Sequence, residues 1–371
     1  MKIGIDARMY GNEECTGIGT YIKNMTNELF KIDQENEYII FLREPAYSNY
    51  TPATERVKKA LVTPRWYTYA EQIKLPLELS KEKLDLIHYP HFNSPILYAK
   101  KSVCTIHDMT PFTFPGHKMS SKWRQFAHKL VFWVTCLKAR QIIAVSESTK
   151  QAITEKFNFN PNKIKVTYEG VDDRFQMTEN NGIISDVKSK FGITQPYIFF
   201  VGVWRNHKNI ENLIKAYNLL KKQSDLPHQL VLGGREDLHY TEVRKEIEKS
   251  EFRKDIITTG FIEDNDLPSL YQGADLFVIP SFIEGFGLIA IEAQNCGCPV
   301  VSSNTTSLPE VLADSALYFD PNKVEGMAKV ITKVLQNKNL QQELKTKGKE
   351  NIKRFSWRQC DEPTLEIYKE A

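Results

Sequence analysis

The sequence predicts an α/β protein built from two Rossmann-like domains, each with a parallel β-sheet that is covered by helices on both faces. Three observations lead to this fold class. At 371 residues the chain exceeds what one hydrophobic core usually supports, so two domains of about 150–200 residues are expected. Short and almost entirely apolar segments alternate with longer segments of helical periodicity along the chain. A polar stretch at residues 180–183 interrupts this alternation, which then resumes.

The first half of the chain contains candidate strands with helical segments between them. The candidate strands are Ile3–Asp6, Glu37–Leu42, Leu84–His88, Ser102–Ile106, Gln141–Val145 and Lys163–Thr167. The candidate helices include Gly19–Lys31, Ala70–Glu78, Lys122–Cys136 and Ser148–Phe157. Repeated β–α–β units with nearly all-apolar strands form parallel sheets that are buried on both faces. The first domain is therefore predicted to span residues 1–184.

The same alternation predicts a second domain over residues 185–354. Its candidate strands are Tyr197–Val201, Gln229–Gly233, Asp255–Thr259, Leu276–Pro280, Pro299–Ser302 and Ala316–Phe319. Helices are expected to begin at Asn209, Leu267 and Leu288. Ligands of such sheets bind beyond the carboxyl ends of the strands, so motifs at strand ends are the best candidates for a site. Residues 355–371 follow the last strand and are expected to be largely helical.

Composition and charge exclude several classes of protein. A content of 41% hydrophobic and 26% charged residues is typical of a globular protein, and a net charge of +3 is too small to indicate a nucleic-acid partner. No apolar stretch approaches the ~20 residues of a membrane span, and the N-terminus lacks the apolar run of a signal peptide. The six cysteines are scattered, without the spacing of a zinc site. We therefore expect a cytoplasmic protein in a reduced compartment.

The segment Ser281–Gln294, SFIEGFGLIAIEAQ, is the first candidate for ligand binding. It follows an expected strand and leads into an expected helix. Gly285 and Gly287 would let a phosphate or a sugar approach the N–H groups of the helix N-terminus closely. Glu292 would lie inside the helix, where its carboxylate could accept hydrogen bonds from the vicinal diol of a ribose. Alternatively, Glu284 is only a favourable acid near a helix N-terminus, and Glu292 lies on a solvated face.

Two other strand ends carry candidate anion-binding groups. Arg205 and Lys208, in VGVWRNHKN, could neutralise a diphosphate, or they could be ordinary cations of a solvated loop. Gly17 and Gly19 follow the first strand and could expose backbone N–H groups to a phosphate or a sugar. A dinucleotide-binding fingerprint would need a third glycine at the position of Ile22, so this class of cofactor is not favoured.

Histidines follow two further strands. His107 precedes Asp108, and the pair could orient or deprotonate a hydroxyl group, or the histidine could simply cap the sheet. His88 and His91 have an HxxH spacing, but Pro90 breaks any helix that would turn both rings to one side. No metal site is therefore predicted.

Two charged segments have competing interpretations. Residues 264–266, Asp-Asn-Asp, have the DxD form that some transferases use to hold a divalent ion, but capping of the next helix is the simpler explanation. Lys118–Arg140 contains six basic residues and no acid, interleaved with aromatic residues. Such a helix can bind anionic lipid headgroups, or it can pack its apolar stripe into the core and leave its cations in water.

Considered together, these segments resemble one known family. PSFIEGFGLIAIEAQNCGCPVVSSNTTSLPEV resembles the donor-site signature of the retaining glycosyltransferases of family 4, with its E-x7-E pattern, and VGVWRNHKNIENLIKAY resembles their Arg/Lys segment. IGIDARMYGNEECTGIGTYIKNM, IHYPHF and IHDMTPF are similar to the bacterial mannosyltransferase-like branch of the family. The resemblance covers nearly the whole chain.

The resemblance implies a GT-B architecture, in which two Rossmann-like domains face each other across a cleft. The donor nucleotide would bind to the C-terminal domain and the acceptor to the N-terminal one, while residues 355–371 would form a helix that returns to the first domain. It implies a nucleotide-sugar co-substrate, with no metal and no other cofactor. GDP-mannose is the first expectation, with UDP-glucose or UDP-N-acetylglucosamine as alternatives.

The resemblance also implies which residues bind the donor. Glu284 would hold the donor sugar, Glu292 the ribose hydroxyls, and Lys208 with Arg205 the diphosphate. Further donor contacts, mostly backbone N–H groups, are expected at Gly285, Phe286, Gly287, Leu288 and Ile262. Many relatives place the arginine directly after the strand-end glycine. Here Val203 occupies that position and Arg205 is displaced.

On the acceptor side, His107 and the loop Gly17–Gly19 would line the cleft. Lys208, Arg205, Glu284 and His107 are therefore the expected catalytic residues. We expect front-face attack with retention, in which the leaving phosphate helps to deprotonate a saccharide or lipid-linked acceptor. A peripheral contact with the inner face of a membrane stays open. The rival classes are a nucleotide-sugar epimerase, a dinucleotide-dependent oxidoreductase and a catalytically silent relative.

Overall fold

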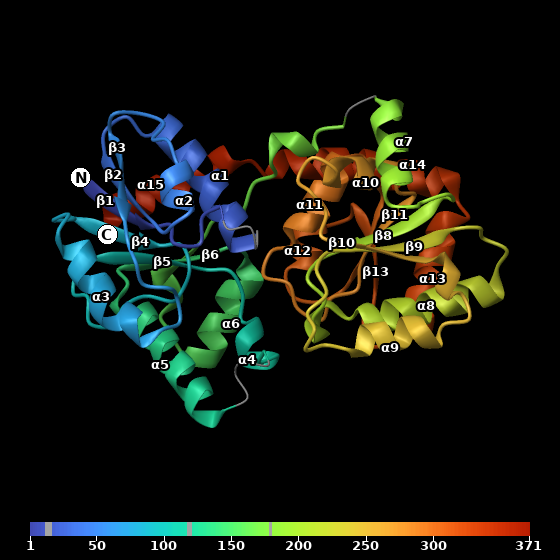
Figure 1. The fold of residues 1–371 in the computed structure, drawn as a ribbon, viewed down its shortest axis with the longest axis horizontal. Helices are drawn as coiled ribbons and strands as arrows, with labels where there is room; N and C mark the ends of the chain where they lie inside the picture. The colour runs from blue at the N-terminus through green and yellow to red at the C-terminus, as the bar shows by residue number, and fades with distance from the viewer. Residues whose placement is uncertain (12–16, 117–120, 178–179) are drawn as a thin grey trace. The chain divides into compact units, whose positions relative to one another are not determined.

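A computed structural model of the protein describes residues 1–11, 17–116, 121–177 and 180–371. The contacts divide the chain into two compact units (Figure 1). The N-terminal unit comprises Met1–Gly170 together with Ser356–Ala371, and the C-terminal unit comprises Val171–Phe355. Each unit contains one entirely parallel β-sheet with helices packed against it, which confirms the predicted fold class.

The N-terminal unit has a seven-stranded sheet in the order β3-β2-β1-β4-β5-β6-β7. The strands are β1 (Lys2–Asp6), β2 (Glu37–Leu42), β3 (Val57–Leu61), β4 (Leu86–Tyr89), β5 (Ser102–Ile106), β6 (Gln141–Ala144) and β7 (Ile164–Val166). β3 was not predicted, because its sequence VKKAL contains two lysines and lies at the sheet edge, where one side of the strand faces water. The strand order reverses between β1 and β4.

Helices cover this sheet on both faces. They are α1 (Gly17–Ile32), α2 (Ala46–Asn49), α3 (Tyr69–Ser80), α4 (Thr110–Thr113), α5 (Lys122–Lys138), α6 (Glu147–Phe157) and α15 (Trp357–Glu370). α3 and α6 begin at capping residues, because the Thr68 hydroxyl accepts from the Glu71 N–H and the Ser146 hydroxyl accepts from the Thr149 N–H. α1 buries an apolar face with helical spacing that includes Tyr21, Met25 and Leu29.

The C-terminal helix α15 belongs to the N-terminal unit and packs along α1 (Figure 1). Tyr368 of α15 is fully buried, and its hydroxyl lies 2.6 Å from Nδ1 of His88 in β4. At the start of the helix, Trp357 passes so close to Gly170 that a Cβ at residue 170 would lie 2.2 Å from the Trp357 nitrogen. A glycine at this crossing is therefore required.

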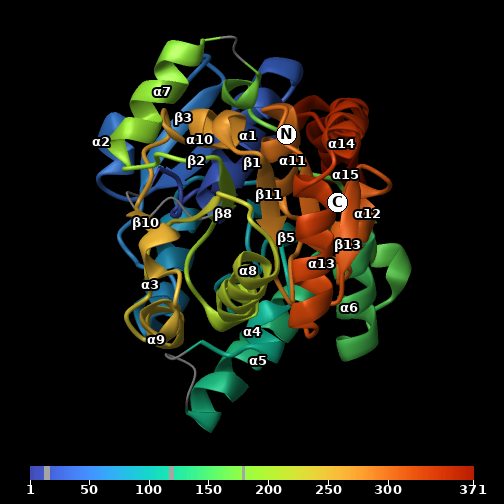
Figure 2. The same cartoon turned by 90° about the vertical axis from the view of Figure 1, so that its right-hand side faces the viewer.

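The C-terminal unit has a six-stranded sheet in the order β10-β9-β8-β11-β12-β13. The strands are β8 (Tyr197–Val201), β9 (Gln229–Gly233), β10 (Ile256–Gly260), β11 (Leu276–Ile279), β12 (Val300–Ser303) and β13 (Ala316–Phe319). The helices are α7 (Asn181–Lys190), α8 (Ile210–Gln223), α9 (Glu242–Lys249), α10 (Leu267–Gly273), α11 (Leu288–Asn295), α12 (Leu308–Leu312), α13 (Val324–Leu335) and α14 (Lys338–Asn351). α8 and α13 pack on one face of the sheet and α10 and α11 on the other (Figure 2).

The boundary between the units lies after Gly170, so the predicted boundary after residue 184 is wrong. Residues that follow Gly170 pack into the C-terminal unit. Phe175 is fully buried with its ring centroid 5.9 Å from that of Tyr271, and α7 packs against α10. The polar composition near residue 180 marks a helix start, because the Asn180 side chain caps α7, and not a linker between domains. The second boundary lies between Phe355 and Ser356.

Among the described helices, none is both long and apolar enough to span a bilayer. The cysteines of the described ranges are all free and buried: Cys104, Cys136, Cys296, Cys298 and Cys360. Cys15 lies outside the described residues.

Candidate functional site

The strand order of the C-terminal unit reverses between β8 and β11, and two of the predicted motifs follow these strands. β8 and β11 are parallel neighbours, with Leu276 paired to Ile198. Residues 202–209 follow β8, and residues 280–287 follow β11. At such a reversal the two connections leave the sheet in opposite directions and open a crevice at the carboxyl ends of the strands. The fold therefore brings both motifs to one ligand-binding position.

Lys208 and Glu284 form a two-point ion pair at this crevice. Lys208 Nζ donates to both carboxylate oxygens of Glu284, at 2.7 Å to Oε1 and 3.0 Å to Oε2, and the Ser281 hydroxyl donates to Oε1 at 2.6 Å. Only 17% of the Lys208 side chain and 11% of the Glu284 side chain are exposed, so water screens the pair weakly. Burial alone would raise the pKa of Glu284, but the Lys208 charge and these hydrogen bonds outweigh burial and lower it. Glu284 is therefore an anion at neutral pH.

Hydroxyl groups from a neighbouring loop hold the backbone around Glu284. The Glu284 N–H donates to Thr306 Oγ1 at 3.0 Å, and the Ser307 hydroxyl donates to the carbonyls of Glu284 and Phe286 at 2.9 and 3.1 Å. The Phe286 ring is buried against Phe355, so the side chain of Phe286 is not exposed to a ligand. Thr306 and Ser307 were not predicted. Their position shortly after β12, at the same sheet edge, is the signal that could have identified them.

Asn209 joins the loop after β8 to the loop after β11. Its backbone is left-handed, with a φ of 56°, a conformation that asparagine adopts more readily than most residues. Its side-chain amide donates to the carbonyls of Pro280 and Pro321 at 2.9 Å each, and the Phe282 N–H donates to the His207 carbonyl at 2.8 Å. These bonds fix the two loops relative to each other, and hence fix the distance between the cation and the carboxylate.

Gly287 begins α11 with a backbone that other residues adopt poorly. Its φ is 98°, and a Cβ there would lie 3.0 Å from Leu308 Cδ2, so both conformation and packing favour glycine. The helix then starts at Leu288, with its N-terminus at the carboxyl end of β11. The first N–H groups of a helix attract anions. Gly285, Gly287 and Leu288 therefore lie at or just before this helix N-terminus, and their contact with a phosphate stays a prediction.

Glu292 is buried inside α11, so the alternative that it lies on a solvated face is wrong. The Tyr271 hydroxyl donates to Glu292 Oε2 at 3.1 Å. Burial raises the pKa of Glu292 to about 7, although the nearby Arg174 charge opposes this rise. A carboxyl group that is half protonated at neutral pH can both donate and accept, which suits a diol ligand.

Asp264 and Asp266 form ion pairs and do not cap α10 with their side chains, so the capping interpretation is wrong. Asp264 pairs with Arg174 at 2.5 Å, and Asp266 pairs with Lys190 at 2.7 Å. Asp266 is the N-cap residue of α10, but its backbone is α-helical and its side chain makes no capping bond. The carboxylates turn to cations from neighbouring segments because a charged partner binds them more strongly than a backbone N–H.

The two remaining predicted donor contacts lie apart from the Lys208–Glu284 pair. Arg205 follows β8 and pairs with Asp237, with Nε 3.5 Å from the carboxylate, and 53% of the Arg205 side chain is exposed. Ile262 follows β10 and is buried at the same sheet edge, where its Cδ1 would lie 2.6 Å from a Cβ at Gly233. Ile262 is thus part of the apolar core beside this sheet edge, whereas Arg205 is a largely exposed cation, which we call the rim of the site.

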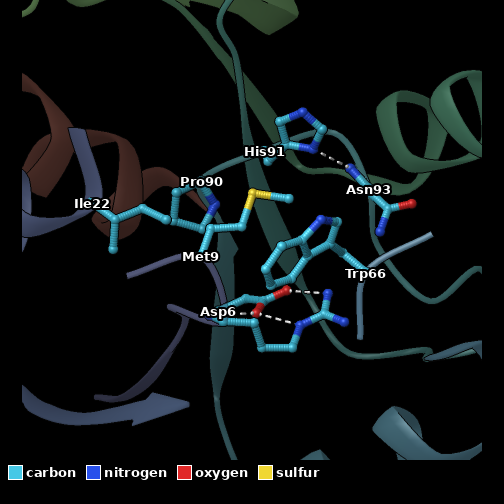
Figure 3. A pocket seen from close by; sticks show the side chains of 8 residues that line it. Asp6, Met9, Ile22, Trp66, Pro90, His91 and Asn93 are labelled. Carbon is cyan, nitrogen blue, oxygen red and sulfur yellow. Dashed lines mark hydrogen bonds and ion pairs between the residues drawn. The ribbon is translucent and has the colours of Figure 1, made fainter. Parts of the chain in front are cut away.

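The N-terminal unit has a second crevice at its own strand reversal, between β1 and β4 (Figure 3). The pocket is lined by Asp6, Arg8, Met9, Ile22, Trp66, Pro90, His91 and Asn93. Figure 3 shows the Trp66 indole beside the ion pair that Asp6 makes at the end of β1. The cavity is small, about 10 Å³, and the guanidinium carbons of Arg43 and Arg65 lie 5.6 and 5.5 Å from the centroid of the Trp66 ring.

Arg8 is the centre of this second cluster. Its guanidinium donates to both oxygens of Asp6 at 2.7 Å and to Glu71 Oε1 at 2.6 Å, and Asn93 Nδ2 donates to the same Glu71 oxygen at 2.5 Å. Burial would lower the pKa of Arg8, but the two carboxylates outweigh burial and raise it. None of these four residues was predicted from the sequence as a site residue. The only signal for this cluster in the sequence is the position of Asp6 at the end of a strand.

His107 does not pair with Asp108, so that part of the prediction is wrong. Nδ1 of His107 lies 3.1 Å from Glu169, and Nε2 lies 2.9 Å from the Pro90 carbonyl. Asp108 accepts instead from the Thr110 N–H at 2.7 Å. Burial lowers the pKa of His107, but Glu169 outweighs burial and raises it. Both ring nitrogens are engaged, so the orientation of the His107 ring is fixed.

The structure also places His88, His91, Gly17 and Gly19 of this unit. His88 is buried between Tyr368 and Thr105, and its burial lowers its pKa to about 3, whereas His91 accepts from the Asn93 N–H at 3.2 Å. Within the described part of the chain no three His, Cys, Asp or Glu side chains are grouped as metal ligands. Gly17 and Gly19 form the first turn of α1, and Gly19 is buried. The preceding Thr16 lies outside the described residues.

Two family models match the chain, one on each unit. Residues 16–175 match the model described as Glycosyltransferase Family 4, and residues 184–351 match the model described as Glycosyl transferases group 1. The O-antigen chain mannosyltransferase B of Escherichia coli is 32% identical over 285 residues, which are 76% of this chain and 74% of that protein. The mannosyltransferase WbdA of the same species is 31% identical over 69% of this chain, which spans about a third (32%) of its length.

Solved structures show the same fold over the whole chain. HepE of Anabaena, solved in complex with UDP-glucose, superposes with a TM-score of 0.79 at 17% identity and covers 100% of both chains. Sucrose-phosphate synthase of Thermosynechococcus elongatus superposes with a TM-score of 0.76 at 18% identity, covering 100% of this chain and 98% of the other.

Proposed function

We propose, since the chain belongs to glycosyltransferase family 4 and has the GT-B fold, that it transfers mannose from GDP-mannose to a saccharide or lipid-linked acceptor. That it is a glycosyltransferase follows from the family. The choice of mannose is supported by the similarity to O-antigen chain mannosyltransferases. The same similarity supports a growing cell-surface polysaccharide as the acceptor.

The Lys208–Glu284 pair at the strand reversal carries this proposal. Glycosyl transfer must stabilise a departing nucleoside diphosphate, and a fixed cation beside a helix N-terminus does this by neutralising the developing charge. In our proposal Lys208 and the first turn of α11 receive the diphosphate. Glu284, which is held as an anion, accepts hydrogen bonds from the hydroxyls of the donor sugar. Arg205 approaches the diphosphate from the rim by leaving Asp237.

We further propose that Glu292 binds the ribose of the donor. Its carboxyl group is buried and already receives a hydrogen bond from Tyr271 on one oxygen. Arg174 and Asp264 pair near it and influence its charge. This arrangement leaves a polar group of defined orientation for the two adjacent hydroxyls of a ribose.

The proposed mechanism is metal-independent front-face transfer with retention. Lys208, Arg205 and the α11 N-terminus supply the positive charge that a divalent ion supplies in other transferases. Glu284 is bound to Lys208 and Ser281 in a position for hydroxyl binding, and we assign it no nucleophilic role. The leaving phosphate then takes the proton of the acceptor hydroxyl as the new bond forms.

We propose that the acceptor binds to the N-terminal unit, near the pocket between β1 and β4. Trp66, Pro90 and Asn93 line that pocket, and the His107 ring is held beside it by Glu169 and by the Pro90 carbonyl. A cytoplasmic location is supported by the buried, free state of the cysteines in the described ranges, since such thiols persist in reducing compartments.

Four measurements test the proposal. In a thermal-shift panel, GDP and GDP-mannose should raise the unfolding temperature more than UDP, UDP-glucose or UDP-N-acetylglucosamine, since a ligand of the folded state stabilises it. NMR of the product should show the donor's anomeric configuration, and a chelator should leave turnover unchanged. Preference for a UDP-sugar would overturn the donor, and inversion would overturn the mechanism. Conversion of the donor without an acceptor would overturn transfer in favour of an epimerase.

A further inference from the structure

α5 carries an apolar stripe on the side that faces away from the protein core. Its members are Trp123, Phe126, Leu130, Trp133 and Leu137, which are between 40% and 81% exposed. With about 3.6 residues per turn, these positions fall within an arc of about 80°. The residues of α5 that are buried in the core, Phe132, Thr135 and Cys136, lie on the opposite side of the helix. The aromatic residues of this segment are therefore not all core residues.

α3 has a second exposed stripe of the same kind. Tyr69, Ile73 and Leu77, at four-residue spacing, are between 64% and 94% exposed, while Leu75 and Leu79 of the same helix are fully buried. Such large apolar side chains at helical spacing on the outer side of two helices are unusual for a protein that remains surrounded by water.

Residues 96–98 connect the two helices by hydrogen bonds. Gln72 of α3 accepts from the Ile96 N–H at 2.9 Å, and Lys138 of α5 donates to the carbonyls of Ile96 and Tyr98 at 2.7 and 2.6 Å. Leu97, between these anchors, is 75% exposed. Figure 1 and Figure 2 both show α3 and α5 as neighbours on the N-terminal unit. We call Tyr69, Ile73, Leu77, Leu97 and the five stripe residues of α5 the α3–α5 apolar surface.

The charges around this surface identify its partner. α5 contains basic residues, with Lys122 and Lys129 exposed beside the stripe, and it contains no Asp or Glu. A second copy of the chain would bring the same positive helices together, which is unfavourable. Tryptophan and tyrosine concentrate at membrane interfaces, and basic residues around an apolar helical face attract anionic headgroups. We propose that the α3–α5 apolar surface binds the headgroup and upper acyl region of an anionic lipid bilayer.

Co-sedimentation with vesicles tests this proposal on the full chain. We expect binding at low salt to vesicles of phosphatidylcholine and phosphatidylglycerol in equal parts, and at least about tenfold weaker binding to phosphatidylcholine alone. The double variant Trp123→Ser/Phe126→Ser should lose about tenfold or more of the binding, because it removes apolar area that enters the bilayer. Its matched control is Ile183→Ser/Leu238→Ser, which removes two exposed apolar side chains of the C-terminal unit and should bind as the parent does.

Charge reversal tests the electrostatic half of the proposal. Lys122→Glu/Lys129→Glu should weaken binding to the mixed vesicles by about tenfold or more, whereas Lys245→Glu/Lys254→Glu, with the same net charge, should not. Equal binding to both vesicle types, or unchanged binding by the aromatic variant, would overturn the proposal. A dimer of the parent protein that the aromatic variant converts to a monomer would also overturn it. So would an acidic protein that binds to the same residues in place of the vesicles. Donor binding by thermal shift, measured on every variant, reports separately on the proposed transferase function.

Discussion

The crevices at the two strand reversals hold buried ion pairs of opposite character. In the N-terminal unit, Arg8 is 3% exposed and is shared between two carboxylates, Asp6 and Glu71. In the C-terminal unit, Lys208 is 17% exposed and has one carboxylate partner, Glu284. A planar guanidinium with two fixed partners is committed to the protein, whereas an ammonium on a flexible stem can exchange one oxygen for another. The Arg8 cluster is therefore expected to stabilise the fold. The Lys208–Glu284 pair is expected to exchange its partners when a ligand binds.

Removal of Arg8 should produce the largest effect and should appear in stability. Arg8→Met leaves two buried carboxylates without their cation, which costs about 3–5 kcal/mol of unfolding free energy for a buried pair broken on one side. Urea unfolding followed by circular dichroism would measure this loss. Arg8→Lys keeps the charge but not the forked geometry, and should lose less. Arg253→Met, at an exposed position, is the control and should change little. A loss below about 1 kcal/mol in Arg8→Met would erase the distinction between the two crevices.

Removal of Lys208 should appear in turnover. Under the proposed function, Lys208→Ala removes the cation that neutralises the departing diphosphate, and loss of one such group typically lowers kcat by about 10²–10³-fold. Initial rates of transfer from GDP-mannose would measure it, with Lys222→Ala, a cation on the exposed surface, as the control. Lys208→Ala should also lower the melting temperature, but by less than Arg8→Met, because it leaves one buried carboxylate without its cation and Arg8→Met leaves two. Turnover within about tenfold of the parent would remove Lys208 from the reaction.

The contrast between the crevices also shows what sequence could and could not predict. Lys208 and Glu284 each follow a strand, and β8 and β11 are neighbours, so placement at strand ends was enough to bring them together. Arg8 escaped prediction because Glu71 lies on a helix that is 63 residues away in the chain. Likewise, His107 takes Glu169 in place of its neighbour Asp108. Pairings between distant segments depend on tertiary packing, which local pattern does not encode.

A buried carboxyl group of the C-terminal crevice should make stability depend on pH. The pKa of Glu292 is raised from 4.5 to about 7 in the folded protein. Because the unfolded chain then releases this proton at a lower pH than the folded one, Glu292 should favour folding below about pH 4.5 and lose this contribution as the pH rises to about 7. When the pH is raised from 5 to 7.5, the parent should therefore lose unfolding free energy through Glu292, and Glu292→Gln should not. The loss in the parent should exceed that in the variant by about 2 kcal/mol. Urea titrations at both values would measure the difference, and parallel curves for the two proteins would contradict it.

The smallest expected effect concerns the one predicted cation that the structure places at the rim. Arg205 is more than half exposed and contacts Asp237 across 3.5 Å, a pair of the kind that contributes about 0–1 kcal/mol. If Arg205 moves to the diphosphate, Asp237 competes with the ligand for it. Asp237→Asn should then tighten GDP binding by up to about fivefold, because 1 kcal/mol corresponds to about that factor. Isothermal titration calorimetry would measure it.

Two further variants decide what a change in GDP affinity means. Arg205→Ala should weaken GDP binding, and Asp237→Asn in the Arg205→Ala background should have no further effect, because the competition needs the arginine. Weaker GDP binding in Asp237→Asn alone would show the reverse: that Asp237 positions Arg205 for the ligand, as Ser281 positions Glu284. In that case the Arg205–Asp237 pair would resemble the fixed Arg8 cluster more than the exchangeable Lys208–Glu284 pair. The C-terminal unit would then contain both a structural and a functional ion pair.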